Sequence, residues 1–382
     1  MFASALGVFV AVGLISIVFV FTLIGIAASV GSTPDYTPKS NTVYKLTLEG
    51  NLSDNTEENP IAMLMGETDK SLSLKDILSS IQTAKENKNI KGIYIEAKSL
   101  STGSASLEAI RRALNDFKES GKFIIAYSDN YTQGCYYLCS VADKVFLNPQ
   151  GTLGLVGMAS QTMFYKDLLK KVGVEMMIFK VGTYKGAVEP FMLDKLSDAN
   201  REQIQSYIST IWDNVTNGIA ESRKIPVADI NSFANQGYAF SAAEKAVECG
   251  LIDELKYRPE AEEFVKELAG QSDKRLQTAS LSNMKSIKTI SREKADRIAI
   301  LYAEGEIKPE TPSSPYNTEQ AITEKVASEL IKLKNDENVK AVVFRVNSPG
   351  GSAFVSEQIW RQVIELKKVK PIVVSMGDVA AS

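Results

Sequence analysis

The chain repeats part of itself at a fixed spacing, and this repeat restricts the folds that it can adopt. The segment Asn89–Glu96 matches Asn338–Arg345 in its apolar pattern, 249 residues further along the chain. The same offset continues without a gap and pairs Asp129 with Asp378. Self-similarity of this kind is typical of a duplicated structural unit. The sequence therefore predicts two copies of one domain.

Within each copy, short β-branched segments alternate with amphipathic stretches. In the second copy the expected strands and helices are, in chain order, Ile298–Tyr302, Glu319–Asn335, Ala341–Val346, Ala353–Lys368 and Ile372–Ser375. Strands that alternate with helices of this length form βαβ units, so we predict an α/β fold with mostly parallel sheets. In the first copy, Leu196–Lys224 and Ala242–Leu251 add helices, which we expect to form a packing arm or an oligomer contact. Because the second copy stops within a motif, we expect the chain to be part of a longer protein.

The composition excludes several classes of function. A formal net charge of −3 gives no broad basic surface, which argues against nucleic acid as a partner. The chain has no histidine, so histidine-based triads and most zinc sites are excluded from it. Its three cysteines, Cys135, Cys139 and Cys249, lack zinc-like spacing and are expected to be buried apolar residues. We predict no metal and no other cofactor.

The first 33 residues carry no charge and are almost entirely apolar. Such a stretch is long enough to cross roughly 30 Å of hydrocarbon, and we predict a transmembrane anchor at 1–33. A cleaved signal peptide is the alternative, which the long apolar core disfavours. The predicted order then continues with an N-terminal domain at 40–271, a polar linker at 272–294 and the start of a C-terminal domain at 295–382.

Two segments of the second copy can supply catalytic groups. Gly350 and Gly351 follow an expected strand and open a helix, where backbone N–H groups can bind the negative charge of an oxyanion. The alternative is a tight turn that needs glycine only for its backbone angles. The next expected strand, Ile372–Ser375, is predicted to be buried and leads toward Ser382. Because the carboxyl ends of parallel strands share one edge, Ser382 and the glycine turn can face one pocket. A helix N-cap is the alternative for Ser382.

The first copy contributes one candidate base. Lys185 lies in the segment Gly182–Phe191 among small and aromatic residues. A lysine is most often a solvated surface charge. Here we expect its neighbours to desolvate the ammonium, so that a neutral lysine could accept the proton of a serine without a histidine.

Three segments, Tyr184–Phe191, Asn347–Ser352 and Gly377–Ser382, resemble the signature segments of signal peptide peptidase A in its long, duplicated bacterial form. The resemblance extends from the apolar N-terminus to the last residue. One departure concerns Gly186, which stands where the family often has a serine. Another is that the Gly-Gly-Tyr expected after the nucleophile is not part of this sequence.

Carried over by position, the resemblance implies that Ser382 is the nucleophile and Lys185 the general base. Backbone N–H groups of Gly350 and Gly351 would form the oxyanion hole. At the repeat offset, Ser382 aligns with Gln133, so the first copy has the lysine and lacks the serine. We therefore expect one active site for each pair of copies.

The resemblance also implies a broader function. It suggests tandem crotonase-like or Clp-protease-like domains that degrade remnant signal peptides by a Ser/Lys dyad and an acyl-enzyme. The expected partners are peptide substrates, the membrane and further copies of the chain, as a tetramer. The expected location is the inner membrane, single-pass, with the catalytic domains on the periplasmic side. A crotonase-type acyl-CoA enzyme and a non-catalytic membrane scaffold are the alternatives.

Overall fold

A computed structural model describes residues 7, 13–18, 35–56, 71–272, 275–288, 296–310 and 321–381. These residues form an α/β structure with mostly parallel sheets, as predicted. The chain divides into two compact units. The first is drawn from 1–93, 101–122 and 269–382, and the second from 94–100 and 123–268.

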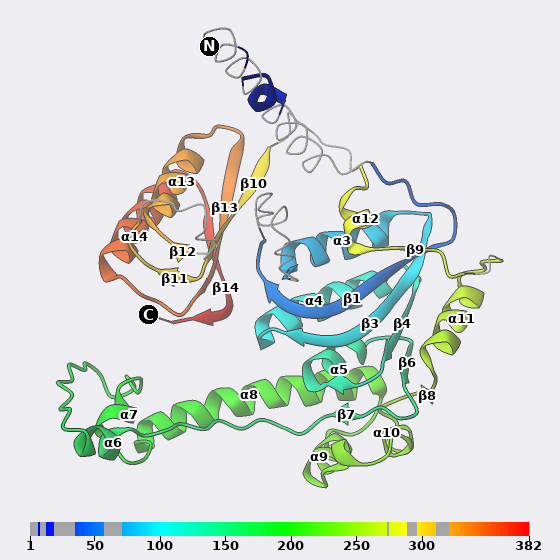
Figure 1. The fold of residues 1–382 in the computed structure, drawn as a ribbon, viewed down its shortest axis with the longest axis horizontal. Coiled ribbons are helices and arrows are strands. Elements are labelled where there is room, and N and C mark those ends of the chain that lie inside the picture. The colour runs from blue at the N-terminus through cyan, green and yellow to red at the C-terminus, as the bar shows by residue number, and fades with distance from the viewer. Residues whose placement is uncertain are drawn as a thin grey trace. The chain divides into compact units, whose positions relative to one another are not determined.

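The first unit begins with a sheet covered by helices (Figure 1). Its elements here are β1 (Thr42–Ser53), β2 (Leu72–Ser73), α3 (Leu74–Glu86), the first part of β3 (Ile90–Ser101), α4 (Ser104–Lys118), β9 (Thr278–Ala279) and α12 (Leu281–Lys285). β2 and β9 both pair with β1 in parallel. Helix α3 begins where the Ser73 side chain accepts the N–H of Asp76, and it buries Leu74, Ile77 and Ile81 along one face.

The rest of the first unit is a three-stranded parallel sheet in the order β10-β13-β14. Its elements are β10 (Arg297–Glu304), β11 (Glu306–Ile307), β12 (Ala321–Ile322), α13 (Glu324–Asn335), β13 (Val339–Ser348), α14 (Ala353–Lys367) and β14 (Ile372–Ala380). Figure 1 shows α13 and α14 on one side of this sheet. Leu330 of α13 and Val355 and Ile359 of α14 are buried with Val342 and Phe344 of β13, which forms the core of this part.

The second unit has strands in the order β3-β4-β6-β8 and a set of helices. Its strands beyond β3 are β4 (Phe123–Ser128), β5 (Tyr131–Thr132), β6 (Lys144–Leu147), β7 (Leu153–Gly154) and β8 (Glu254–Leu255). Its helices are α5 (Gln133–Cys139), α6 (Lys166–Lys171), α7 (Glu189–Met192), α8 (Asp198–Arg223), α9 (Val227–Asn235), η1 (Tyr238–Phe240), α10 (Glu244–Glu248) and α11 (Arg258–Leu268). The long helix α8 has Ser197 as its N-cap. Its C-cap is Lys224, whose backbone has a left-handed conformation.

The order of elements recurs along the chain. A strand, a short strand, a helix, a strand, a helix and a strand form β1-β2-α3-β3-α4-β4. The same order returns from β10 to β14, with two short strands, β11 and β12, in place of one. Helices α4 and α14 begin 249 residues apart, as do strands β4 and β14. This recurrence supports the predicted duplication, while the tandem domains and their boundaries at 40–271, 272–294 and 295–382 stay predictions.

Three sequence expectations about elements need correction. Helix α13 begins at Glu324 instead of 319, because Ala321–Ile322 form the strand β12. Helix α10 spans only Glu244–Glu248. The strand expected at Ile372–Ser375 continues to Ala380 and is not buried, since the side chains of Val373 and Met376 are 63% and 67% exposed. The reason is that β14 is the last strand of its described sheet.

Other expectations fall partly outside the described residues. The predicted anchor at 1–33 is described only at 7 and 13–18. In the part of the chain that the structure describes, no helix is long and apolar enough to cross a membrane. The same part contains no group of acidic or cysteine side chains that could hold a metal ion. Cys135 and Cys139 are buried as expected, and Cys249 is half-buried.

A buried ion pair connects three elements of the first unit. The guanidinium of Arg345, on β13, donates to both carboxylate oxygens of Asp54, at 3.0 and 2.8 Å. It also donates to the carbonyl of Met376 on β14, at 2.7 Å. The Asp54 side chain is 1% exposed and the Arg345 side chain is 14% exposed. This pair therefore fixes β13 and β14 to the chain that follows β1.

We expect Arg345→Leu to lower the free energy of unfolding by about 3–5 kcal/mol, because it leaves the buried carboxylate of Asp54 without its partner. Urea unfolding of the variant and the wild type measures this loss. Arg361→Leu is the control, since Arg361 pairs with Glu365 along one helix and is largely exposed. It should cost less than about 0.5 kcal/mol. Equal losses in both variants would contradict the structural role of the Arg345 pair.

Candidate active site

The glycine turn has a backbone conformation that favours glycine. Gly350 and Gly351 have φ angles of +102° and +149°. The turn pairs with β11, because the N–H of Ile307 donates to the carbonyl of Gly350 at 2.9 Å and the N–H of Ser352 donates to the carbonyl of Ile307 at 2.7 Å. A Cβ atom on Gly351 would collide with the backbone of Ile307. Glycine is therefore required here by both the φ angles and the close approach of β11.

The two N–H groups of the turn have different surroundings. The N–H of Gly350 donates to the hydroxyl of Ser348, at 3.1 Å. The pairing with Ile307 uses the carbonyl of Gly350 and the N–H of Ser352, so the N–H of Gly351 points away from β11. Helix α14 starts directly afterwards, with Ser352 as its N-cap. The N–H of Gly351 is thus not used in the pairing with β11, and it lies beside the positive end of a helix.

The described residues that precede Ser382 lie beside this turn. Ser382 itself lies outside the described residues. The N–H of Ala381, the residue before it, donates to the carbonyl of Ser348 at 2.9 Å. The N–H of Val379 donates to the side chain of Asn347 at 3.0 Å. Ser348 thus contacts both the glycine turn and the residue that precedes the predicted nucleophile.

Lys185 belongs to the second unit, whereas the glycine turn and Ala381 belong to the first. It lies in the loop before α7, where its N–H donates to the carbonyl of Gly182 at 3.5 Å. The expected desolvation is not found, because the residue is exposed. The residue of this segment that is buried is instead Glu189, the first residue of α7. The approach of Lys185 to Ser382 stays a prediction.

The buried carboxylate of Glu189 connects the segment that contains Lys185 to the start of α8. It accepts hydrogen bonds from the N–H and hydroxyl of Ser197, at 3.1 and 2.5 Å, and from the amide of Asn200, at 3.1 Å. Burial by itself would raise the pKa of Glu189, but these hydrogen bonds and the charge of Lys180 at 3.8 Å leave it below its usual value. The sequence reasoning missed this residue, although it is part of the segment Tyr184–Phe191.

Gly186 lies against the same network. A Cβ atom at this position would overlap the amide of Asn200, which donates to Glu189. The serine that the family often has here could therefore not be introduced into this chain unless Asn200 moved. Where the family often has a serine, this chain has Gly186, and the side chain of Asn200 occupies the space beside it.

We expect Gly186→Ala to destabilise the protein by about 1–3 kcal/mol, because displacing Asn200 leaves the buried carboxylate of Glu189 with one hydrogen bond fewer. Thermal or urea unfolding measures the change. Asn200→Ala is the matched variant, and Gly186→Ala added to it should cost little more, since the overlapping amide is gone. Fully additive losses would show that the two residues act independently.

The first copy has Gln133 at the repeat position of Ser382. Its side-chain oxygen accepts the N–H groups of Val156 and Gly157, at 3.1 and 3.0 Å, and its amide nitrogen donates to the carbonyl of Gly157 at 3.2 Å. These bonds fix the chain after β7. Gln133 therefore has a structural use at the position where the second copy carries a hydroxyl.

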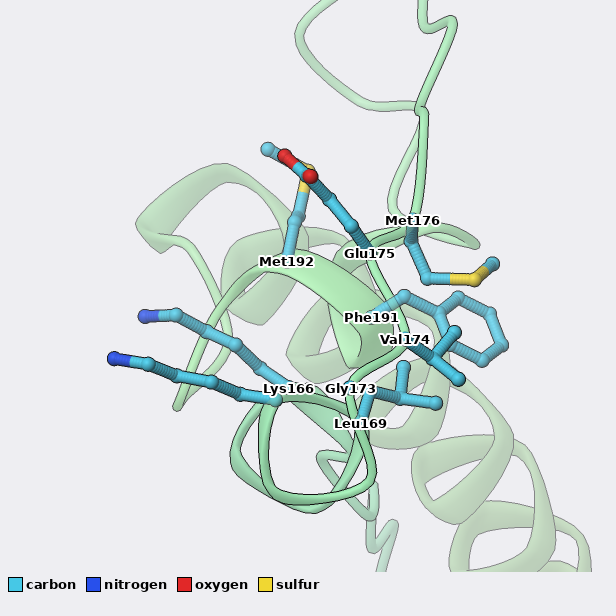
Figure 2. A pocket seen from close by; sticks show the side chains of 9 residues that line it. Lys166, Leu169, Gly173, Val174, Glu175, Met176, Phe191 and Met192 are labelled. Carbon is cyan, nitrogen blue, oxygen red and sulfur yellow. The ribbon is translucent and has the colours of Figure 1, made fainter.

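The second unit also contains a pocket of about 460 Å³ along α6 and α7. Figure 2 shows that Leu169, Val174, Met176 and Phe191 gather in it. The pocket is further lined by Lys166, Lys170, Gly173, Glu175 and Met192. The lining of the pocket does not include Lys185, the predicted base.

Comparisons with known proteins agree with the motifs. The sequence profile of Peptidase family S49 matches residues 116–272. "Protease 4" of Haemophilus influenzae is 33% identical over 386 residues, which cover 95% of this chain and 62% of that protein. "Protease 4" of Salmonella typhi is 37% identical over 320 residues, covering 81% of this chain and 51% of that protein. "Serine protease SPPA, chloroplastic" of Arabidopsis thaliana is 32% identical over 356 residues, covering 90% and 50%.

These similarities support a protein of the signal peptide peptidase A type. The resemblance seen in its motifs is therefore confirmed. The S49 match includes Lys185 and Gln133, and ends before the glycine turn and Ser382. The similarities support a serine protease of the S49 family. The chain spans between 50% and 62% of the lengths of these three relatives.

Proposed function

We propose that this S49 chain belongs to a membrane-anchored serine endopeptidase that degrades remnant signal peptides with a Ser/Lys dyad. The observation that carries the proposal is the junction at Ser348. The hydroxyl of this residue accepts the N–H of Gly350, while its carbonyl accepts the N–H of Ala381. Ser382, the residue after Ala381, would then lie close to the backbone N–H groups of the glycine turn, which are suited to an oxyanion hole.

The proposed reaction follows from these groups. The hydroxyl of Ser382 attacks the carbonyl carbon of the peptide bond, and its proton passes to the neutral amine of Lys185. The N–H of Gly351 stabilises the negative oxygen of the tetrahedral intermediate, joined by the N–H of Gly350 if it leaves Ser348. The protonated lysine then gives its proton to the leaving amine. Water hydrolyses the acyl-enzyme and regenerates the serine.

A lysine is the proposed base because the sequence has no histidine. Lys185 is exposed in the described structure, so the proposal requires that other parts of the full assembly or the substrate cover it. Such cover would remove water from the amine, which favours its neutral form. We propose a homo-oligomer at the inner membrane, with its catalytic domains on the periplasmic side and peptides as its substrates.

Lys185→Ala in the full-length protein should lower turnover of a peptide substrate by several orders of magnitude. The reason is that it removes the general base of a proposed dyad whose two residues act together. The melting temperature should change little, since the Lys185 side chain is exposed. Lys195→Ala is the control, because Lys195 is an exposed lysine close by in the chain. Near wild-type turnover in Lys185→Ala would exclude the residue as the base.

The rate of the full-length enzyme should rise with pH in a single limb that continues into the alkaline range. The reason is that Lys185 must lose its proton before it can accept the proton of Ser382. Inactivation by a serine-directed phosphonate should follow the same curve, and such inactivation also separates the peptidase from an acyl-CoA enzyme. A limb near pH ~6.5 that survives Lys185→Ala would indicate a histidine instead and contradict the Ser/Lys mechanism.

A further inference from the structure

Asp378 lies four residues before Ser382 and binds the start of a helix from the other copy. Its carboxylate accepts the N–H of Ser106 at 2.9 Å and the hydroxyl of Ser106 at 2.7 Å. It also accepts the N–H of Gly103 at 3.1 Å and the hydroxyl of Thr102 at 3.3 Å. All of these residues belong to the first unit. The carboxylate is thus bound by four donors at the N-terminus of α4.

Helix α4 has no cap of its own. Its N-cap residue is Gly103, which has no side chain to accept a hydrogen bond. The carboxylate of Asp378 takes that place by accepting the N–H of Ser106 in the first turn, where negative charge is also favoured by the helix dipole. A Cβ atom on Gly103 would lie 2.5 Å from Cγ of Asp378. Glycine at this position therefore makes room for the carboxylate.

The chain around Asp378 is also held from β13. The carbonyl of Met376 accepts from Arg345, the N–H of Val379 donates to the side chain of Asn347, and the N–H of Ala381 donates to Ser348. These contacts all come from one strand. Asp378 adds the contact from α4, so the segment 376–381 is fixed by two different elements.

The repeat shows that this contact is specific to the second copy. Asp129 occupies the equivalent position in the first copy, and its carboxylate accepts from Tyr127, Asn148 and Arg258. These partners lie in the same unit as Asp129. In the first copy, Asp129 thus binds residues of its own unit and its own copy. In the second copy, Asp378 connects the segment before Ser382 to helix α4 of the first copy.

We infer that Asp378 is a positioning residue, which anchors the segment 376–381 on α4 and so fixes the direction in which Ser382 enters the active site. This inference rests on the proposed function. A displacement of about 1 Å in a reacting group can lower a rate by about a hundredfold. Asp378 would therefore act on turnover without touching the substrate.

The test uses the full-length enzyme with a peptide substrate and a serine-directed phosphonate. Asp378→Ala should lower kcat by about ten- to a hundredfold, with KM within about twofold of the wild type. The rate of phosphonate labelling at Ser382 should fall by the same factor. Asp116→Ala, near the other end of α4, is the control and should leave both rates unchanged, although it removes the contact with Lys85.

A second variant separates positioning from stability. Asp378→Ala also removes the cap of α4, so part of any loss could come from a weakened helix. Gly103→Ser in the Asp378→Ala background supplies a local N-cap, for which serine is well suited. We expect this double variant to regain the melting temperature of the wild type while kcat stays low. In the wild-type background, Gly103→Ser should itself lower kcat, because its side chain displaces Asp378.

Two other outcomes would contradict the inference, and they differ in what they say about the proposed function. If the wild type is labelled at Ser382 and Asp378→Ala keeps its kcat, or the double variant regains kcat together with stability, Asp378 has no positioning role. If the wild type is not labelled at Ser382 at all, the proposed function fails and this inference fails with it.

Discussion

The hydrogen bonds of Ser348 are the interaction on which the candidate site depends. Its side chain is 1% exposed, and buried polar groups of this kind must find partners within the protein. The hydroxyl donates to the carbonyl of Gly305 at 2.7 Å and accepts the N–H of Gly350, and the carbonyl accepts the N–H of Ala381. One residue at the end of β13 thus satisfies groups from the end of β10, from the glycine turn and from the end of β14.

The two copies use the same elements for different purposes. In the first copy, the positions equivalent to the predicted nucleophile and to Asp378 are Gln133 and Asp129, and both stabilise their own surroundings. In the second copy, the corresponding segment is attached to α4 and leads to a hydroxyl. The aspartate of the first copy thus has partners close to it in its own copy, whereas the aspartate of the second copy binds a helix of the first.

Much of the fold could be predicted from local pattern. Helix α14 begins at Ala353 as expected and ends one residue early, because apolar spacing and the N-cap Ser352 define it within the sequence. The length of β14 could not be predicted, since Asn347 and Ser348 extend its pairing beyond Ser375. Such contacts depend on tertiary structure and leave no periodic signal.

The candidate site was predictable only in part. The glycine turn was predicted from its sequence, and the structure adds its pairing with β11. The roles of Glu189 and Asp378 were not, because their partners lie at distances along the chain that no motif encodes. The exposure of Lys185 was also unexpected, because small and aromatic neighbours in sequence do not fix which residue of a loop turns inward.

The outer edge of β14 has a consequence for handling the protein. Val373 and Met376 are largely exposed on a strand that ends its described sheet. An apolar strand edge of this kind can pair with the edge of another molecule. Such pairing between molecules would be opposed by dilution, by a mild detergent or by a lysine placed on the outer face of β14.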